Sequence, residues 1–294
     1  MPEGDSPTVA RRRVRLALRE ARERADLTQA QVAEEMEWSL SKVIRIENGD
    51  VSISQNDLRP LLGMLGIRDK EQVNALIADT RIARTRQRKL WFQNPEFREN
   101  LTDATRKLIE YEHEASQIRS YSVYYVPGPL QTSEYAKALM TRFEDELTAD
   151  QIDRRIEARR LRRESLLERA EAGHVRILVM LDESVLRRTI GGTTVYVDQL
   201  RELRRLITTG TITMRMVPFA MDASVTNNAS FDLLVLGEGE VLYRETGLGD
   251  EMIEDRDATA KHGARYDKVW SEVADEERTL AFIDRQIQNP NGHF

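Results

Sequence analysis

The sequence predicts an α+β protein with an all-helical five-helix domain, residues 1–89, followed by a larger mixed domain, residues 90–294, whose small sheet is flanked by helices. Apolar residues recur at helical spacing between helix-capping residues as far as about residue 77. Aromatic residues become frequent at Trp91, which indicates a second core. Short runs rich in β-branched residues begin only at Val175, so strands are expected only after that point.

Residues 28–49 organise the first domain. Thr28 and Ser39 can each cap a helix, because a hydroxyl accepts a hydrogen bond from a free backbone N–H at a helix start. In the second helix, Val43 and Ile46 lie three apart on one face, and Gly49 tolerates the left-handed conformation common at helix ends. Two short capped helices joined by a tight turn predict a helix-turn-helix.

Three more helices are expected around this pair, over residues 8–24, 55–65 and from Asp69 onward. In the first of them, Val9, Leu16 and Ala17 form the predicted apolar stripe. Arg11-Arg12-Arg13 are interpreted either as solvated surface or as phosphate contacts. The basic run 81–89 is either a connecting helix or an additional phosphate-binding strip.

The second domain alternates helices with short strands. Helices are expected over residues 102–118, 132–140, 149–172, 197–208, 266–273 and 276–288, with a short helix at Leu186. Strands are expected over residues 175–181 and 211–217, and over residues 231–236 and 240–245 as a hairpin. Residues 126–129 contain two prolines and a glycine and must turn.

Composition and charge narrow the function classes. The net charge is −6, but residues 1–90 hold 17 Lys+Arg and 14 Asp+Glu, a surplus of +3, and the remainder holds 27 and 36, a deficit of −9. DNA binding needs only such a local positive part. The chain has no cysteine, which excludes disulfides, thiolate metal sites and cysteine nucleophiles. With no apolar run of the ~18 residues that span a bilayer, and no signal peptide, we expect a soluble, cytoplasmic protein without a membrane partner.

Two stretches of the sequence carry family resemblances. The helix-turn-helix resembles that of the Cro/phage-repressor-like (XRE) family in Thr28-Gln29, Val32-Ala33, Ser39 and Ile46-Glu47-Asn48-Gly49. The larger domain resembles that of the actinobacterial WhiJ-like regulators in YYVPGPLQTSEYA, VMLDESVLRR with Gly191-Gly192, QLRELRRLI, and SFDLLVL with VLYRE, although Pro129 replaces an aliphatic residue. These resemblances imply a transcriptional regulator, often considered antitoxin-like, that binds double-stranded DNA, works with a small partner protein encoded nearby and is not an enzyme.

The predicted DNA contacts follow from helix-turn-helix geometry, in which the second helix enters the major groove. Lys42 and Arg45 can donate to guanine or phosphate, and Leu40 can touch a thymine methyl. Gln29 is placed to grip a phosphate with its side chain or its backbone amide. The complete predicted set is Thr28, Gln29, Ser39, Leu40, Ser41, Lys42 and Arg45. Such proteins bind as dimers on half-sites roughly 34 Å apart, so a homodimer is expected.

Glu47 does not fit beside DNA, because phosphate repels a carboxylate. We expect it to pair inside the domain with an arginine, such as Arg13 or Arg19, or to act as a cap. Val43 and Ile46 should face the core.

The second domain offers partner or ligand candidates. These are Tyr124, Tyr125, Pro127, Gly128, Gln131 and Thr132. An alternative function is ligand sensing, in which Tyr121, Tyr124 and Tyr125 line a pocket together with Trp91. The same aromatic residues could also form core or a protein-binding surface.

An enzyme is the least favoured class. The four histidines, His113, His174, His262 and His293, lack metal-binding spacing. Asp182 and Glu183 follow a predicted strand and could form a carboxylate pair, but helix capping explains them better. Gly237-x-Gly239 lacks the rest of a dinucleotide fingerprint. We therefore expect no catalytic residues, no metal and no cofactor.

Overall fold

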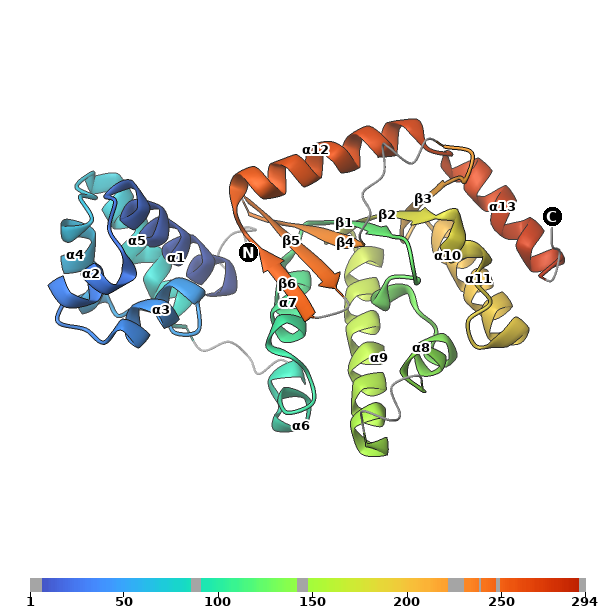
Figure 1. Ribbon diagram of the computed structural model, residues 1–294, viewed down its shortest axis with the longest axis horizontal. Coiled ribbons are helices and arrows are strands. Elements are labelled where there is room, and N and C mark those ends of the chain that lie inside the picture. The colour runs from blue at the N-terminus through green and yellow to red at the C-terminus, as the bar shows by residue number, and fades with distance from the viewer. Residues whose placement is uncertain are drawn as a thin grey trace. The chain divides into compact units, whose positions relative to one another are not determined.

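The computed structural model describes residues 7–85, 91–141, 148–221, 230–237, 239–246 and 249–290, without the side chains of residues 245 and 246. By its internal contacts the chain divides into two compact units, Met1–Lys89 and Leu90–Phe294. Among the described residues, no helix combines the length and apolar character needed to cross a membrane. The predicted fold class is confirmed, with a helical first unit and a second unit built on a six-stranded mixed sheet (Figure 1).

The first unit is the expected five-helix bundle. Its helices are α1 (Pro7–Arg24), α2 (Gln29–Glu35), α3 (Leu40–Asn48), α4 (Gln55–Met64) and α5 (Lys70–Ala83). The buried side of α1 differs from the prediction, because Val14, Leu18 and Ala21 enter the core whereas Leu16 is partly exposed. Leu16 lies about 200° around the helix from Val14 at 100° per residue, so it cannot share that face.

The triple arginine of α1 makes contacts within the fold, and only Arg12 of the three is fully buried. Arg11 Nε donates to Ser52 Oγ at 3.2 Å, Arg12 is buried, and Arg13 bonds both oxygens of Asp79 at 3.0 and 2.5 Å. These contacts tie α1 to α5 and to the loop after α3. In the basic run 81–89, α5 ends at Ala83, and residues 86–89 lie outside the described residues.

The second unit is built on one sheet with strand order β3-β2-β1-β4-β5-β6. The strands are β1 (Gln117–Ser122), β2 (Arg176–Asp182), β3 (Thr213–Val217), β4 (Phe231–Leu236), β5 (Gly239–Thr246) and β6 (Gly249–Ile253). Strands β1, β2 and β3 run parallel, and β4, β5 and β6 continue the sheet antiparallel from β1. The predicted strands and hairpin are therefore present, whereas β1 and β6 were not predicted.

The central strand β1 was not predicted, because the expected helix extended to Ile118 and no strand was assigned to residues 119–122. The helix α7 (Asp103–Glu114) ends earlier, and residues 117–122 pair with both β2 and β4. The strand has no apolar run, and its polar side chains bond to neighbouring elements instead. Ser120 Oγ donates to Asp232 at 2.5 Å, and Arg119 pairs with Glu240 and Asp267. Such burial of polar groups is tolerated when they are hydrogen-bonded.

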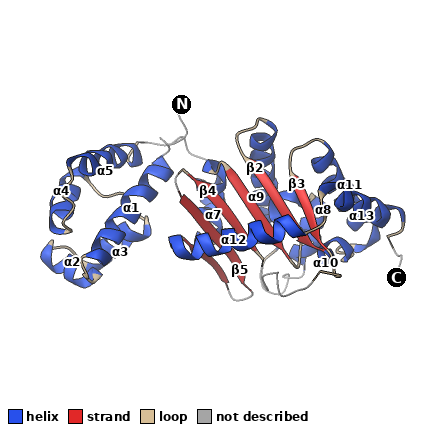
Figure 2. Ribbon diagram, turned by 90° about the horizontal axis from the view of Figure 1, so that it is seen from above, coloured by secondary structure: helices blue, strands red, loops and turns tan. Residues whose placement is uncertain are grey.

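Helices cover both faces of this sheet (Figure 2). The helix α12 (Arg256–Glu272) crosses one face and packs on Tyr121, Met180 and Leu233. The opposite face carries the larger core with α7, and with α8 (Ser133–Met140), α9 (Ala149–Glu171), α11 (Gly192–Thr208) and α13 (Glu276–Gln288). Short elements complete the unit: η1 (Trp91–Gln93), α6 (Pro95–Arg98), η2 (Gly128–Leu130) and α10 (Glu183–Arg187). Two helices begin earlier than predicted: α11 at Gly192 instead of residue 197, and α12 at Arg256 instead of residue 266.

Candidate nucleic-acid interface

The two hydroxyl caps of the helix-turn-helix form as predicted. Thr28 Oγ1 accepts from the Gln31 N–H at 3.2 Å, and the Gln31 side chain accepts from the Thr28 N–H at 2.8 Å, which completes a capping box. Ser39 Oγ accepts from the Lys42 N–H at 3.2 Å. The predicted DNA contacts Thr28 and Ser39 therefore hold the starts of α2 and α3 with their side-chain oxygens.

Gly49 ends α3 in the left-handed conformation, with φ of 80°. Its N–H bonds the carbonyls of Arg45 and Ile46. A Cβ at this position would lie 2.9 Å from Arg15 Cδ, so both the backbone conformation and the space require glycine here. The end of α3 is therefore fixed against α1.

The two sides of α3 separate core from surface. Val43 and Ile46 are buried, as predicted, while Ser41 and Arg45 are exposed and Leu40 keeps 46% of its surface exposed. Ser41 and Arg45 are four residues apart and share a helix face. The guanidinium of Arg45 and the hydroxyl of Ser41 bond none of the described residues, so both are available to base edges or phosphate.

Lys42 already has interaction partners within the first unit, which limits its availability as the predicted DNA contact. Its Nζ lies 3.7 Å from the centre of the Trp38 ring and 3.2 Å from Asp57 Oδ2. The ammonium thus already has a cation–π and an ion-pair partner. Sequence reasoning missed Trp38 and Asp57, because no spacing rule connects Lys42 to a carboxylate on the next helix.

Glu47 pairs inside the unit, but neither predicted partner is the right one. Arg22 bonds both of its oxygens, with Nε at 2.7 Å and Nη2 at 3.0 Å, whereas Arg13 bonds Asp79 and Arg19 bonds Glu23. The hydrogen bond to Glu47 raises the pKa of Arg22 above its ordinary value. Burying this carboxylate requires such pairing.

The side chain of Gln29 completes the same buried network. Its Nε2 donates to Glu47 Oε2 at 2.8 Å. The side-chain amide nitrogen thus joins the start of α2 to the end of α3 and is already engaged, whereas a phosphate contact by the backbone amide of Gln29 stays a prediction. The network fixes the angle between the two helices.

The six partner or ligand candidates fall into two groups. Tyr124 and Tyr125 are 57% and 43% exposed, with ring centres 6.4 Å apart. Gln131 is only 6% exposed and donates to the Val126 carbonyl at 2.7 Å, and the Thr132 hydroxyl caps α8. The side chain of Gln131 is therefore a structural group and not a docking surface, because its hydrogen bonds are made inside the unit.

Pro127 and Gly128 belong to the turn that precedes Gln131 and packs against α9. Pro127 precedes η2, and a Cβ at Gly128 would lie 3.3 Å from Arg162 Nη1 and 3.6 Å from Arg159 Nη1. The turn thus allows the arginines of α9 to approach its backbone. The proposed aromatic pocket does not form, since Tyr121 is buried under α12 and Tyr124 and Tyr125 are on the surface, whereas Trp91 lines a different pocket.

The two carboxylates considered as a catalytic pair, Asp182 and Glu183, both make structural hydrogen bonds. Asp182 caps α10 by accepting from the Ser184 N–H at 2.9 Å. Glu183 bonds Arg187 at 2.6 Å and accepts from the Phe219 N–H at 2.8 Å. In the parts of the chain that the structure describes, no group of three or more His, Asp and Glu residues is arranged to hold a metal. His293 lies outside them.

Comparison with known families gives two matches. Residues 105–285 match the family described as a domain of unknown function (DUF5753), and residues 14–76 match a helix-turn-helix domain. No curated protein and no solved structure matches the chain. The helix-turn-helix match covers α2 and α3 and supports a DNA-binding transcriptional regulator.

Proposed function

The chain belongs to the DUF5753 family, and from this premise we propose that it is a sequence-specific transcriptional regulator whose helix α3 enters the major groove of DNA as part of a homodimer. The observation that carries the groove assignment is the pair Ser41 and Arg45. Both are exposed on one face of α3 and neither side chain bonds another described residue. An arginine in this position can donate to guanine O6 and N7 at once.

The test is Arg45→Ala measured on the operator that the wild-type chain selects from a random duplex library. The variant should lose about 1–3 kcal/mol of binding free energy on that operator and relax its preference at one base pair. Arg68→Ala is the matched control, because Arg68 is an exposed arginine beyond the far end of α4. Equal operator affinity of the wild type and Arg45→Ala contradicts the groove assignment.

Dimerisation is the second part of the proposal. A helix-turn-helix pair reads two half-sites about 34 Å apart, which requires two copies of α3 held by a two-fold contact. Light scattering of the free chain and of the chain on its operator measures the stoichiometry. A monomer in free solution, together with one chain bound per operator, contradicts the homodimer.

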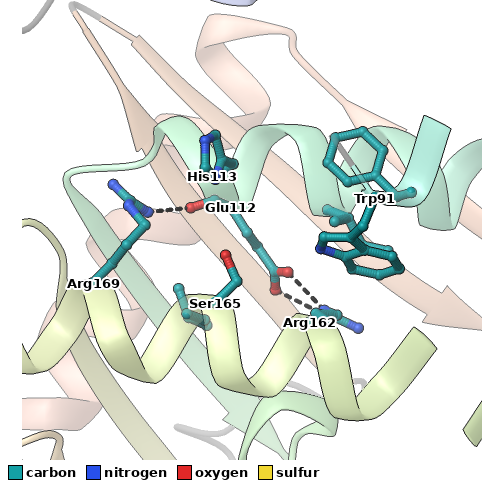
Figure 3. Close-up of a pocket in the computed structure, with 9 residues that line it drawn as sticks. Trp91, Glu112, His113, Arg162, Ser165 and Arg169 are labelled. Carbon is teal, nitrogen blue, oxygen red and sulfur yellow. Dashed lines mark hydrogen bonds and ion pairs between the residues drawn. The ribbon is translucent and has the colours of Figure 1, made fainter. Parts of the chain in front are cut away.

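The third part concerns a small partner protein encoded nearby, as in antitoxin-like regulators, with no enzymatic activity of the second unit. The exposed pair Tyr124 and Tyr125 supports this part, because tyrosine is enriched where protein surfaces bind. Tyr124→Ala combined with Tyr125→Ala should abolish calorimetric binding of the purified neighbour-encoded protein. Unchanged affinity of this double variant contradicts the assigned surface. The alternative function is small-molecule sensing by the second unit. The pocket that Trp91 lines (Figure 3) supports this alternative.

A further inference from the structure

The exposed apolar side chains of the second unit gather at one edge of its sheet. Among the described residues of this unit, the exposed large hydrophobic side chains are Tyr124, Tyr125 and Phe219, and Phe219 keeps 55% of its surface exposed. Strands β1, β2 and β3 run parallel, the two tyrosines follow β1, and Phe219 follows β3. Because neighbouring strands lie about 4.8 Å apart, the ends of β1 and β3 are about 10 Å apart, a span that large side chains cover. We call these three residues the aromatic edge.

The short helix α10 holds the backbone beneath the aromatic edge. Ser184 Oγ donates to the Val123 carbonyl at 3.1 Å. The carboxylate of Glu183 accepts from the Phe219 N–H at 2.8 Å. The segment after β1 and the segment after β3 are thus bonded to consecutive residues of α10, so the exposed rings stand on a fixed backbone.

One cation beside α10 has no partner among the described residues. Asp182 accepts from the Ser184 N–H at 2.9 Å. Glu183 bonds Arg187 at 2.6 Å, so this carboxylate compensates the charge of that arginine. Arg188 is exposed, and its side chain bonds none of the described residues. Arg188 is therefore the charge that this part of the surface offers to a partner.

Arg188 lies close to the aromatic edge. Burial raises the pKa of the Tyr135 hydroxyl to about 12, and the charges of Tyr125 and Arg188 both act on this hydroxyl. Electrostatic effects of this kind weaken with distance, so Tyr125 and Arg188 approach the same buried group. An exposed apolar surface and an uncompensated guanidinium therefore adjoin.

From this arrangement we propose that the aromatic edge and Arg188 dock an acidic segment of the partner protein, with an apolar side chain against the rings and a carboxylate on the Arg188 guanidinium. The inference rests on the partner binding proposed above and assigns the chemistry of that partner. Clustered exposed apolar side chains mark interaction sites, and Tyr and Arg are enriched among the residues that carry binding energy. A guanidinium can donate two parallel hydrogen bonds to one carboxylate, and complementary charge selects the partner.

The experiment uses the full chain and a library of random short peptides displayed on phage. Peptides selected by the wild type should combine Asp or Glu with a large apolar residue, and Arg188→Glu should shift the selection toward Lys and Arg. Arg176→Glu is the matched control, because Arg176 is an exposed arginine at the opposite, amino end of β2. This control should select the same peptides as the wild type. Selection of basic peptides by the wild type, or of no peptide, overturns the proposal.

A synthetic copy of the most enriched peptide separates the proposal from its premise. Its calorimetric affinity should fall about tenfold in Arg188→Glu and about fivefold in Phe219→Ala, and should be unchanged in Arg176→Glu. Unchanged affinity in Tyr124→Ala combined with Tyr125→Ala overturns the partner surface itself. Loss of binding in that double variant, with wild-type affinity in Arg188→Glu and Phe219→Ala, retains the partner surface and overturns the chemistry assigned to the partner.

Discussion

The ammonium of Lys42 in α3 lies 3.2 Å from Asp57 Oδ2 in the first turn of α4, above the ring of Trp38. This ion pair places a carboxylate beside the surface that we propose for DNA. A phosphate near this position repels the Asp57 carboxylate and competes with it for the ammonium. The pair therefore limits how much positive charge α3 offers, in a unit whose surplus is only +3 over residues 1–90.

Asp57→Asn should consequently tighten DNA binding. Removing one negative charge beside the groove should raise non-specific affinity about three- to tenfold at low salt and steepen the salt dependence by about one ion. Filter binding over a range of salt concentrations measures both. Glu71→Gln, which removes an equal charge from the start of α5, serves as control. Weaker binding by Asp57→Asn contradicts the competition between Asp57 and phosphate.

Gly49→Ala should destabilise the first unit more than Gly66→Ala. Both glycines have positive φ, 80° and 75°, so both variants incur the roughly 1–2 kcal/mol cost of the left-handed conformation. Only at Gly49 does the new methyl meet a neighbour, Arg15, at 2.9 Å, while nothing lies within 4 Å at Gly66. Urea unfolding followed at Trp38 measures the difference, and equal losses of stability contradict a steric role for Arg15.

Glu47→Ala should be among the most damaging substitutions in the first unit. It leaves the largely buried Arg22 without its carboxylate and frees the Gln29 amide, and breaking a buried pair in this way costs about 3–5 kcal/mol. Glu23→Ala is the control, because Glu23 is an exposed carboxylate that pairs with Arg19 at 3.1 Å and only loosely with Arg22 at 3.4 Å, and exposed pairs contribute about 0–1 kcal/mol. Comparable unfolding free energies of the two variants disagree with this prediction.

The second unit should lose stability in alkali. Burial raises the pKa of Tyr135 to about 12 and that of Tyr196 to about 12, from an ordinary value of 10.0. Above pH 10 the unfolded chain releases these protons and the folded unit retains them, so unfolding becomes more favourable as pH rises from 10 to 12. Urea unfolding at stepped pH, with tyrosinate absorbance as probe, checks this.

Replacement of both tyrosines isolates their contribution to that pH dependence. The double variant Tyr135→Phe with Tyr196→Phe should show a shallower loss of unfolding free energy above pH 10, although it also loses the hydrogen bonds to Val126 and Leu186. An identical slope in the wild type and the double variant would assign the alkaline loss to other groups.

The helix-turn-helix could be predicted from the sequence because its capping interactions are local. Thr28, Ser39 and Gly49 act on backbone groups within four residues of themselves, so their roles depend on sequence spacing alone. The same holds for Asp182, whose cap on α10 was predicted. The strand β1 was missed for the opposite reason. Its polar side chains Ser120 and Arg119 bond to Asp232, Glu240 and Asp267, which lie more than a hundred residues away along the chain.

The sequence by itself determined the α+β class, the two capped helices and the outward face of α3 at Ser41 and Arg45, because periodicity and capping are local properties. Only the tertiary structure decided which charges remain available. It joined Glu47 to Arg22 and Gln29, Lys42 to Asp57, and Glu112 to Arg162, each across different helices. Ion pairs between helices depend on how those helices pack, and that packing is set by the whole core rather than by any one segment.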